Sequence, residues 1–405
     1  MSEIDSLATI QRLQFTDRKK AERLLQQWFV RHMHLVTESV TLMPKAVSLN
    51  SFNGLYRSEG EEYFFKTHVE EQGIVEEYYH AELLSNAGYN IVRPLRVLHE
   101  KEQQMVVYPV VRWPIMFDLV RAVETGITEH VSMATLISAE MRECERLLGI
   151  YRDTLAASIG EENAAAPIHQ LFWHRITGGR FSNFYRSKFV TFPVAHLQRQ
   201  GIAFDELLGY RWVINGVIQR QSLGQLVERA SIVLDPGKAM ATVIGHGDAH
   251  FGNVFLENER QYLYFDPAFA GRHSPLLDII KPLFHNVFAT WMYFPDDVAR
   301  NLHLSVSVDD RTIVIEHDYT LTPVRRAILQ TKIAHLLRPL VEELRRQDAL
   351  PEDWRETMQL ALMCCPLLTI NLLDEQRFPP IISWLGLSLA VQIGNSGIEA
   401  WSNEL

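Results

Sequence analysis

Three oxygen-bearing side chains stand at fixed offsets in the middle of this 405-residue chain. Asp248 is followed after five positions by Asn253, and Asp266 comes thirteen positions later. Phosphoryl transfer from a nucleotide needs one carboxylate to orient the attacking hydroxyl. It also needs oxygen ligands to hold the Mg²⁺ that bridges the nucleotide phosphates. The three residues therefore fit the chemistry of a magnesium-dependent phosphotransfer site.

A predicted strand and two glycines place the first of these residues. The apolar run 241–244 is typical of a short buried strand, and Gly245 and Gly247 interrupt it around His246. Asp248 then falls on a tight loop directly after the strand.

A predicted hairpin places the other two. Residues 254–256 and 262–265 are apolar, and the polar turn 257–260 lies between the predicted strands 254–256 and 261–265. Such a hairpin would bring Asp266 back beside Asn253, so that two metal ligands converge.

The pattern resembles the aminoglycoside phosphotransferase and choline kinase-like group of small-molecule kinases. The resemblance rests on His-Gly-Asp at 246–248, an Asn five residues after the Asp, and an Asp after a hairpin. It implies that Asp248 is the catalytic base, that Asn253 binds magnesium, and that Asp266 is the principal magnesium ligand.

The resemblance extends to the residues around this core. It implies that His246 braces the loop, and that Asp278, in the run Pro-Leu-Leu-Asp, supports the loop from the start of a helix. Pro267 and Ala268 follow Asp266, so the Asp-Phe-Gly form of protein kinases is absent, which argues against a protein kinase.

A lysine on a strand is the next requirement, because it holds the nucleotide phosphates. The aromatic run 63–68 carries Lys66 after the turn 58–61. A charged side chain in such a strand is costly without a partner. Lys66 is therefore the predicted nucleotide-binding lysine.

An acidic residue on the following helix should hold that lysine. A helix is predicted over 74–87 and ends at Gly88, which suits a C-cap. The spacing of apolar residues in the resembled family favours Glu77 as the partner of Lys66, with Glu82 as the alternative.

The loop over the phosphates and the hinge follow from order along the chain. Residues 45–49 and 55–57 are predicted strands with a phosphate-covering loop at 50–54 between them. Residues 92–98 and 104–111 are two further strands. The candidate phosphate contacts are Ser51, Asn53 and Gly54, and the candidate adenine contacts, made through the backbone of the hinge at 108–112, are Tyr108 and Val110.

The implied architecture is α+β and bilobal, like a protein kinase. Residues 1–111 would form a small N-lobe with an antiparallel sheet and an amphipathic helix over 19–34, and residues 112–405 a larger, mostly helical C-lobe. The expected activity is Mg²⁺-dependent transfer of the γ-phosphate of ATP or GTP to a hydroxyl of a sugar, amino sugar, aminoglycoside or amino alcohol. Two alternatives stay open: a catalytically silent nucleotide-binding regulator, and a nucleotidyltransferase using the same site.

Charge, hydrophobic runs and cysteine content limit the kinds of partner and compartment to be expected. A net charge of −10, from 39 basic and 49 acidic residues, disfavours nucleic acid. No apolar run reaches the roughly 18 residues that span a bilayer, and 381–393 is better interpreted as a buried helix. The acidic N-terminus is unlike a signal peptide. The three cysteines lack metal-ligand spacing and are expected to be reduced core residues. These features favour a cytoplasmic enzyme with no membrane partner, and they leave the oligomeric state open.

Three further regions lie outside this scheme. The basic, aromatic segment 174–186 is either a loop lining the acceptor site or a surface loop. Residues 302–319 alternate as a hairpin, either an arm over the acceptor or a dimer contact. His250 is expected near the acceptor rather than on a metal, and Arg272 and His273 are hypothesised to face the transferred phosphate.

Overall fold

The chain divides into two compact units. One comprises Met1–Trp113 and Leu263–Ala268, and the other Pro114–Tyr262 and Phe269–Leu405. The first unit thus includes a short second piece of chain, which contains Asp266, whereas the sequence placed a single boundary after residue 111. The computed structural model describes residues 7–43, 51–68, 73–98, 104–127, 131–196 and 199–398.

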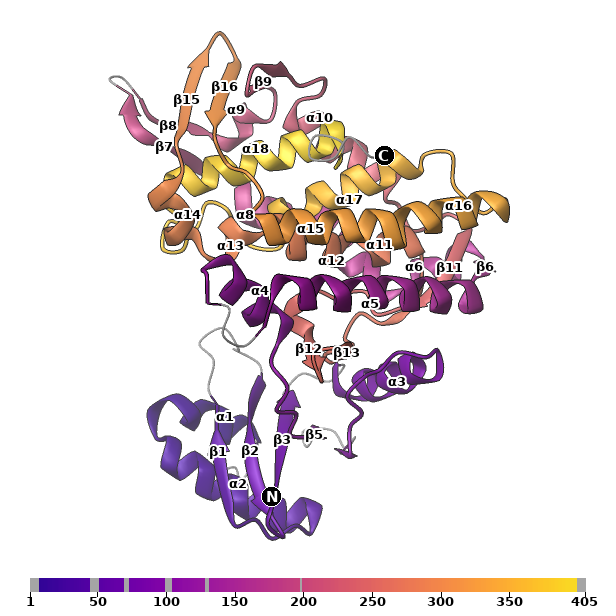
Figure 1. Ribbon diagram of the computed structural model, residues 1–405. Coiled ribbons are helices and arrows are strands. Elements are labelled where there is room, and N and C mark those ends of the chain that lie inside the picture. The colour runs from indigo at the N-terminus through magenta and orange to yellow at the C-terminus, as the bar shows by residue number, and fades with distance from the viewer. Residues whose placement is uncertain are drawn as a thin grey trace. The chain divides into compact units, whose positions relative to one another are not determined.

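The first unit is built on an antiparallel sheet of five strands in the order β1-β2-β3-β5-β4 (Figure 1). Glu59 and Gly60, both with positive φ, make the tight turn between β2 and β3. The antiparallel N-terminal sheet predicted from the sequence is confirmed. The strands are β1 (Ser39–Leu42), β2 (Ser51–Ser58), β3 (Glu61–His68), β4 (Arg96–Leu98) and β5 (Met105–Pro109).

Two helices, α1 (Leu7–Thr16) and α2 (Arg18–Met33), bury their apolar sides in the core of this unit. Asp17 caps α2 by accepting a hydrogen bond from the Lys20 N–H. Phe29 meets Phe65 of β3 edge to face, with 5.5 Å between the ring centroids. The predicted amphipathic helix over 19–34 is therefore confirmed.

The phosphate-covering loop predicted at 50–54 is wrong for the residues that the structure describes. Ser51, Asn53 and Gly54 lie within β2, where Gly54 pairs with Leu42 of β1. A Cβ on Gly54 would lie 2.3 Å from the Thr41 carbonyl oxygen, so this glycine permits close strand packing. The strand predicted over 45–49 lies outside the described residues, and β1 occurs earlier in the chain.

The helix predicted after Lys66 is α3 (Gly73–Asn86), and it is confirmed. Gly88 has φ of 102°, and the Tyr89 N–H reaches back to the Leu84 carbonyl at 3.0 Å, which closes the helix end. Ala81 and Leu84 are buried, whereas Glu82 is exposed.

The second unit is mostly helical. In Figure 1, α17 and α18 lie side by side, and α5 packs against α15. The predicted buried helix over 381–393 is α18, with Trp384 fully buried. The longer helices are α4 (Met116–Glu124), α5 (Met133–Thr154), α10 (Leu223–Val233), α14 (Pro295–Asn301), α15 (Pro323–Lys332), α16 (Arg338–Arg346), α17 (Trp354–Leu368) and α18 (Pro380–Ser396).

Short helices connect the longer ones. Five-residue π-helical segments extend α12 and α15 at Phe284–Phe288 and Ile333–Leu337. Single turns of 3-10 helix occur at Pro167–Leu171 and Phe251–Asn253. The short α-helices are α6 (Gly160–Ala164), α7 (Trp173–Thr177), α8 (Arg180–Tyr185), α9 (Phe204–Leu207), α11 (Pro275–Asp278), α12 (Ile280–Leu283) and α13 (Thr290–Tyr293).

Small sheets join these helices, in the orders β14-β11-β6, β12-β13, β7-β8 and β10-β9-β16-β15. The hairpins predicted over 254–265 and 302–319 are confirmed as β12–β13 and β15–β16, and β9 adds to β16 in parallel. The strands are β6 (Ala156–Ser158), β7 (Phe189–His196), β8 (Arg199–Ala203), β9 (Arg211–Ile214), β10 (Val217–Ile218), β11 (Met240–Gly245), β12 (Val254–Glu257), β13 (Gln261–Tyr264), β14 (Gly271–His273), β15 (Leu304–Asp309) and β16 (Thr312–His317).

Two expectations from composition can be compared with the structure. Cys144, Cys364 and Cys365 are free and buried, as predicted. Among the described helices, none is long and apolar enough to cross a membrane.

Candidate active site

The loop that carries Asp248 begins where β11 ends, and two glycines allow its path. A Cβ on Gly245 would lie 2.5 Å from the His273 ring and from the Asp278 carboxyl. Gly247 has φ of 78°, and a Cβ there would lie 2.3 Å from the Phe269 carbonyl oxygen. The strand predicted over 241–244 is confirmed, and both glycines are needed for the turn that follows it.

Asp278 supports this loop from α11, as the resemblance implied. Its Oδ1 accepts hydrogen bonds from the Gly247 N–H at 2.6 Å and from His273 Nε2 at 2.9 Å, and its Oδ2 accepts one from the Tyr151 hydroxyl. Burial alone would raise the pKa of Asp278. The hydrogen bond and charge of His273, together with the bonds from Tyr151 and Gly247, bring that pKa below its ordinary value.

This arrangement overturns the hypothesis for His273. Its ring is fully buried against Asp278, so it does not face a transferred phosphate. The guanidinium of Arg272 donates to the Thr154 carbonyl oxygen at 2.8 Å. His246 is also fully buried, with Nδ1 3.4 Å from the Asp248 amide nitrogen, in the bracing position that the resemblance implied.

Asp248 is held by its backbone. Its carbonyl oxygen accepts hydrogen bonds from Asn253 Nδ2 at 2.9 Å and from the His250 N–H at 2.8 Å. Its Oδ1 is buried and accepts no hydrogen bond from any residue that the structure describes. The nearest cation to this atom is Lys281, whose Nζ is 3.7 Å away, while Oδ2 lies 3.9 Å from His250 Nε2. Because Asn253 uses its amide nitrogen inside the loop, its Oδ1 is the atom suited to a metal ion.

Sequence reasoning missed Lys281. Its side chain is buried, and its Nζ lies 2.8 Å from His285 Nε2, while His285 Nδ1 lies 2.7 Å from the Tyr293 hydroxyl. A lysine ammonium only donates, so the proton of neutral His285 sits on Nδ1. Burial, followed by the charge of Lys281, holds the pKa of His285 well below its ordinary value. A lysine in the otherwise apolar run 279–284 was the signal, because an unpartnered charge there is costly.

A second buried contact reaches the loop from the π-helical segment. Asn286 Oδ1 accepts a hydrogen bond from the Phe251 N–H at 2.8 Å. The Asn286 carbonyl in turn accepts one from Arg325, which forms a buried ion pair with Glu124. No local sequence signal marks these residues, because their partners lie far apart in the chain.

In the first unit, the structure brings together Lys66 and Asp266. Lys66 lies on β3, as predicted, and its Nζ is 3.3 Å from Asp266 Oδ1. Asp266 has φ of 57°, in the left-handed region that Asp tolerates better than most residues. Glu77 lies in α3, but its side chain is outside the described residues, so its pairing with Lys66 stays a prediction.

The other nucleotide-site candidates also lie in or beside the sheet. Asn53 is opposite Lys66 in the β2–β3 register, and its Oδ1 is buried with no hydrogen-bond partner in the described ranges. Tyr108 lies on β5 opposite Phe64, and Val110 follows β5 half-buried. The adenine hinge stays a prediction, as does the approach of Asp266 to Asn253.

The segment 174–186 is not a loop, which corrects the sequence interpretation. It forms α7 and α8. Arg175 of α7 and Arg180 of α8 both donate hydrogen bonds to the carbonyl oxygen of Leu368. Two helices this short are set by such tertiary contacts rather than by local propensity.

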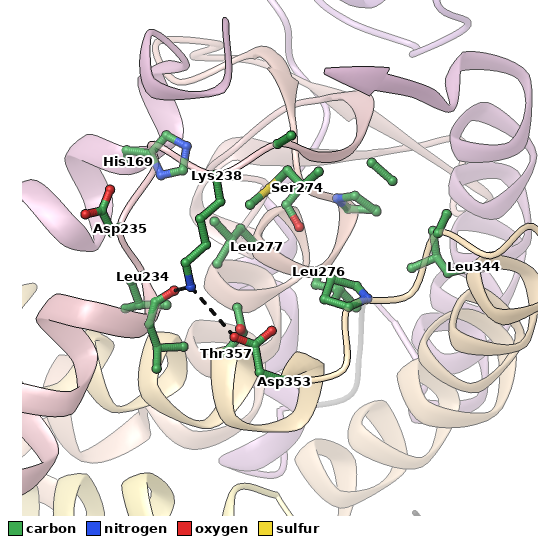
Figure 2. Close-up of a pocket in the computed structure, with 17 residues that line it drawn as sticks. His169, Leu234, Asp235, Lys238, Ser274, Leu276, Leu277, Leu344, Asp353 and Thr357 are labelled. Carbon is green, nitrogen blue, oxygen red and sulfur yellow. Dashed lines mark hydrogen bonds and ion pairs between the residues drawn. The ribbon is translucent and has the colours of Figure 1, made fainter. Parts of the chain in front are cut away.

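A cavity elsewhere in the second unit lies beside the start of β11 (Figure 2). Figure 2 shows Lys238 extended toward Asp353, and their charged atoms are 3.8 Å apart. Both side chains are about half exposed, and the rest of the lining is mostly apolar. None of the predicted site residues lines this cavity.

Comparison with known proteins gives the fold. No protein-family model and no curated protein sequence matches the chain. A thermostable mutant of aminoglycoside phosphotransferase APH(4)-Ia, solved as a ternary complex with AMP-PNP and hygromycin B, matches with a TM-score of 0.50 and 10% identity. The match covers 91% of this chain and 98% of that one. The chain has the fold of this aminoglycoside phosphotransferase.

Two other solved structures are similar over most of their length. Spectinomycin phosphotransferase APH(9)-Ia, with ADP and spectinomycin, has a TM-score of 0.39 at 14% identity over 92% of this chain and 97% of that one. Macrolide 2′-phosphotransferase MphH from Brachybacterium faecium has a TM-score of 0.41 at 14% identity, over 92% of this chain and 97% of that one. The predicted fold, α+β with an antiparallel N-terminal sheet and a larger helical part, is confirmed by the aminoglycoside phosphotransferase fold and by the elements above.

Proposed function

We propose that this protein is a magnesium-dependent phosphotransferase that moves the γ-phosphate of a nucleotide, with ATP as the first choice, to a hydroxyl group of a small molecule. The observation that carries the proposal is the setting of Asp248. A loop fixed by Asp278 and Asn253 presents its carboxylate, whose buried Oδ1 lies 3.7 Å from Lys281 Nζ and whose Oδ2 lies 3.9 Å from His250 Nε2. The fold supports the proposal, because the neighbour of known structure binds AMP-PNP and hygromycin B together.

The roles follow from the chemistry of each group. Asp248 accepts the proton of the acceptor hydroxyl as the acceptor oxygen bonds to the γ-phosphorus, and the bond to the nucleoside diphosphate breaks. Lys66 binds the nucleotide phosphates, and Asn53 lies on the neighbouring strand to assist. Lys281 holds Asp248 from the Oδ1 side, which leaves Oδ2 for the acceptor.

The residues present also fit a magnesium ion. Mg²⁺ prefers oxygen ligands and is bound by one or two carboxylates together with substrate phosphates. Asp266 offers a carboxylate whose side chain is 44% exposed, and Asn253 offers Oδ1. When bound, the ion would neutralise charge on the transferring phosphoryl group.

The test is phosphorylation of a panel of hydroxyl compounds, read by mass spectrometry with ATP or GTP and Mg²⁺. The panel includes sugars, amino sugars, aminoglycosides, choline-like amines and nucleosides. One added phosphate, absent with Asp248→Asn and retained with Asp153→Asn, supports the proposal. Asp153 suits the control because it is exposed near the end of α5.

The same spectra separate the alternatives. A product heavier by a nucleotidyl group would identify a nucleotidyltransferase. Tight binding of Mg²⁺-nucleotide without any product across the panel would favour a nucleotide-binding regulator.

A further inference from the structure

Two arginines converge on one backbone carbonyl in the second unit. Arg175 of α7 and Arg180 of α8 both direct Nη1 at the carbonyl oxygen of Leu368, at 3.4 and 3.1 Å. Leu368 is the last residue of α17, and both arginine side chains are half-buried. The two guanidinium groups are therefore neighbours in a partly desolvated place.

The positive charge of this pair is not balanced within the described residues. No carboxylate there forms an ion pair with Arg175 or Arg180, and their hydrogen bonds to the described residues use two of the ten N–H groups that they carry. The C-terminus of a helix carries only about half a negative charge. This partial charge neutralises only part of the two positive charges. Capping the end of α17 therefore does not account for both guanidinium groups.

The pair belongs to the neighbourhood of Asp248. α17 contacts α7 and α8 as well as α12, the helix that carries Lys281. Cys365, one turn before the end of α17, has its pKa raised to about 12 by burial, against the opposing charges of Lys281 and Arg175. Asp248 also acts on it. The charges of Lys281, Arg175 and Asp248 thus all influence the pKa of Cys365.

The electrostatics of Arg175 agree with this placement. Its pKa falls to about 10, first because of burial and then because of the like charge of Arg180, while Asp248 acts in the opposite direction. Asp248 is the one carboxylate among the groups that act most strongly on it. Arg175 is therefore within electrostatic range of both Arg180 and Asp248, the proposed base.

We propose that the acceptor is an anionic hydroxyl compound whose carboxylate or phosphate group binds between Arg175 and Arg180, so that its hydroxyl reaches Asp248. This proposal rests on the function proposed above. Guanidinium groups bind carboxylates and phosphates through paired, charge-assisted hydrogen bonds. Such an anion relieves the repulsion between the two arginines, whereas a cationic acceptor adds to it.

The direct test is binding of inorganic sulfate, measured by isothermal titration calorimetry at constant ionic strength. The full-length protein is saturated with ADP and Mg²⁺, so that sulfate does not report on the nucleotide site. We expect Arg175→Gln and Arg180→Gln each to weaken sulfate binding by about tenfold or more, since each removes hydrogen bonds to a charged group. The matched control, Arg186→Gln, removes an exposed arginine at the end of α8 and should bind like the wild type.

Because both arginines also contact the end of α17, the Gln variants are checked by thermal unfolding. Arg175→Lys and Arg180→Lys keep the positive charge and a donor, so they should retain more of the sulfate affinity than the Gln variants. The proposal is overturned if the wild type binds no sulfate, or if all the variants bind it equally.

A second arm identifies the anion and separates this proposal from the one on which it rests. Glucose, glucosamine, glucuronate and glucose 6-phosphate share hydroxyl groups and differ in charge. Sulfate should inhibit transfer to these compounds. Faster phosphorylation of glucuronate would indicate a carboxylate site, and faster phosphorylation of glucose 6-phosphate would indicate a phosphate site. Preferential transfer to glucose or glucosamine overturns the anionic class but keeps the kinase. Sulfate binding that depends on both arginines, with no transfer to any compound, supports the anion site and counts against the kinase.

Discussion

At the scale of single residues, Asp248 gives the sharpest prediction. Asp248→Asn should lower kcat by about 10²- to 10⁴-fold, because an amide cannot take the acceptor proton. The nucleotide KM should change little, whereas the unfolding midpoint should fall, because the amide leaves the buried Lys281 without the carboxylate that lies 3.7 Å from its Nζ. Steady-state kinetics and thermal unfolding measure both quantities. Near wild-type kcat in this variant would remove Asp248 from the role of base.

Asp278 gives a prediction about pH. Its folded-state pKa is depressed, so its contribution to stability is present above its unfolded pKa of about 3.9 and is lost as pH falls through the lower folded value. At pH 7, Asp278→Asn should lower the free energy of unfolding by about 3 kcal/mol, because three buried donors lose their carboxylate. Urea unfolding between pH 3 and 7 should show the gap between wild type and variant shrinking below about pH 4. A gap independent of pH would contradict the depressed pKa.

Local spacing was enough to place Lys66 within a strand and Asp248 in the loop after a strand, because each of these strands has its own turn signals. It was not enough for Lys281 and His273, whose partners are fixed only in the folded chain. No prediction was made for Lys281, whose ammonium lies 3.7 Å from Asp248 Oδ1. His273 looked like a phosphate contact, whereas the turn into α11 buries it against Asp278.

At the scale of elements, the hairpins and long helices were predictable because their signals are local. Alternating apolar residues, helix caps and turn residues all lie within a few positions of one another. The short elements were not. β1 and the helices α7 and α8 are each too short to be stable alone, so tertiary contacts decide them. Gly54 shows the same effect, since what appeared to be a loop glycine is required by the approach of Thr41.

The contact between the π-helical segment and the 248–253 loop can be tested at this scale. Asn286→Ala would leave the Phe251 N–H without its partner and should lower the free energy of unfolding by about 1–3 kcal/mol. It should also lower kcat, because the 248–253 loop loses a fixed point. Asn301→Ala is the matched control, because its amide only reaches an exposed carbonyl one turn away. Equal unfolding midpoints for the two variants would show that the contact does not hold the loop.

At the scale of the whole molecule, the first unit is assembled from two distant pieces of chain. Residues 263–268 join it through a parallel bridge between Ile91 and Tyr264 and through backbone hydrogen bonds between Tyr264 and residues 90–92. Sequence patterns predicted a single boundary near residue 111, because they report on neighbours and not on a return of the chain 150 positions later. The division into two functional lobes stays a prediction.

This assembly predicts that residues 1–113 are incomplete by themselves. A fragment of those residues should unfold at a lower temperature than the same fragment extended through a flexible linker by residues 258–268. The extension restores two backbone hydrogen bonds with Tyr264, the contact of His80 with the Pro267 carbonyl, and the Lys66–Asp266 pair. At about 1 kcal/mol for each hydrogen bond, the difference should be about 3 kcal/mol, or about 10 °C or more for a unit of this size.

The control is a glycine-serine extension of equal length, which keeps the tether but lacks the strand residues that place Tyr264, Asp266 and Pro267 against the fragment. Thermal unfolding by circular dichroism measures all three proteins. If the contacts stabilise the unit, only the native extension raises the midpoint. If the tethered peptide acts merely by its presence, both extensions raise the midpoint equally, and residues 263–268 would then not stabilise the first unit.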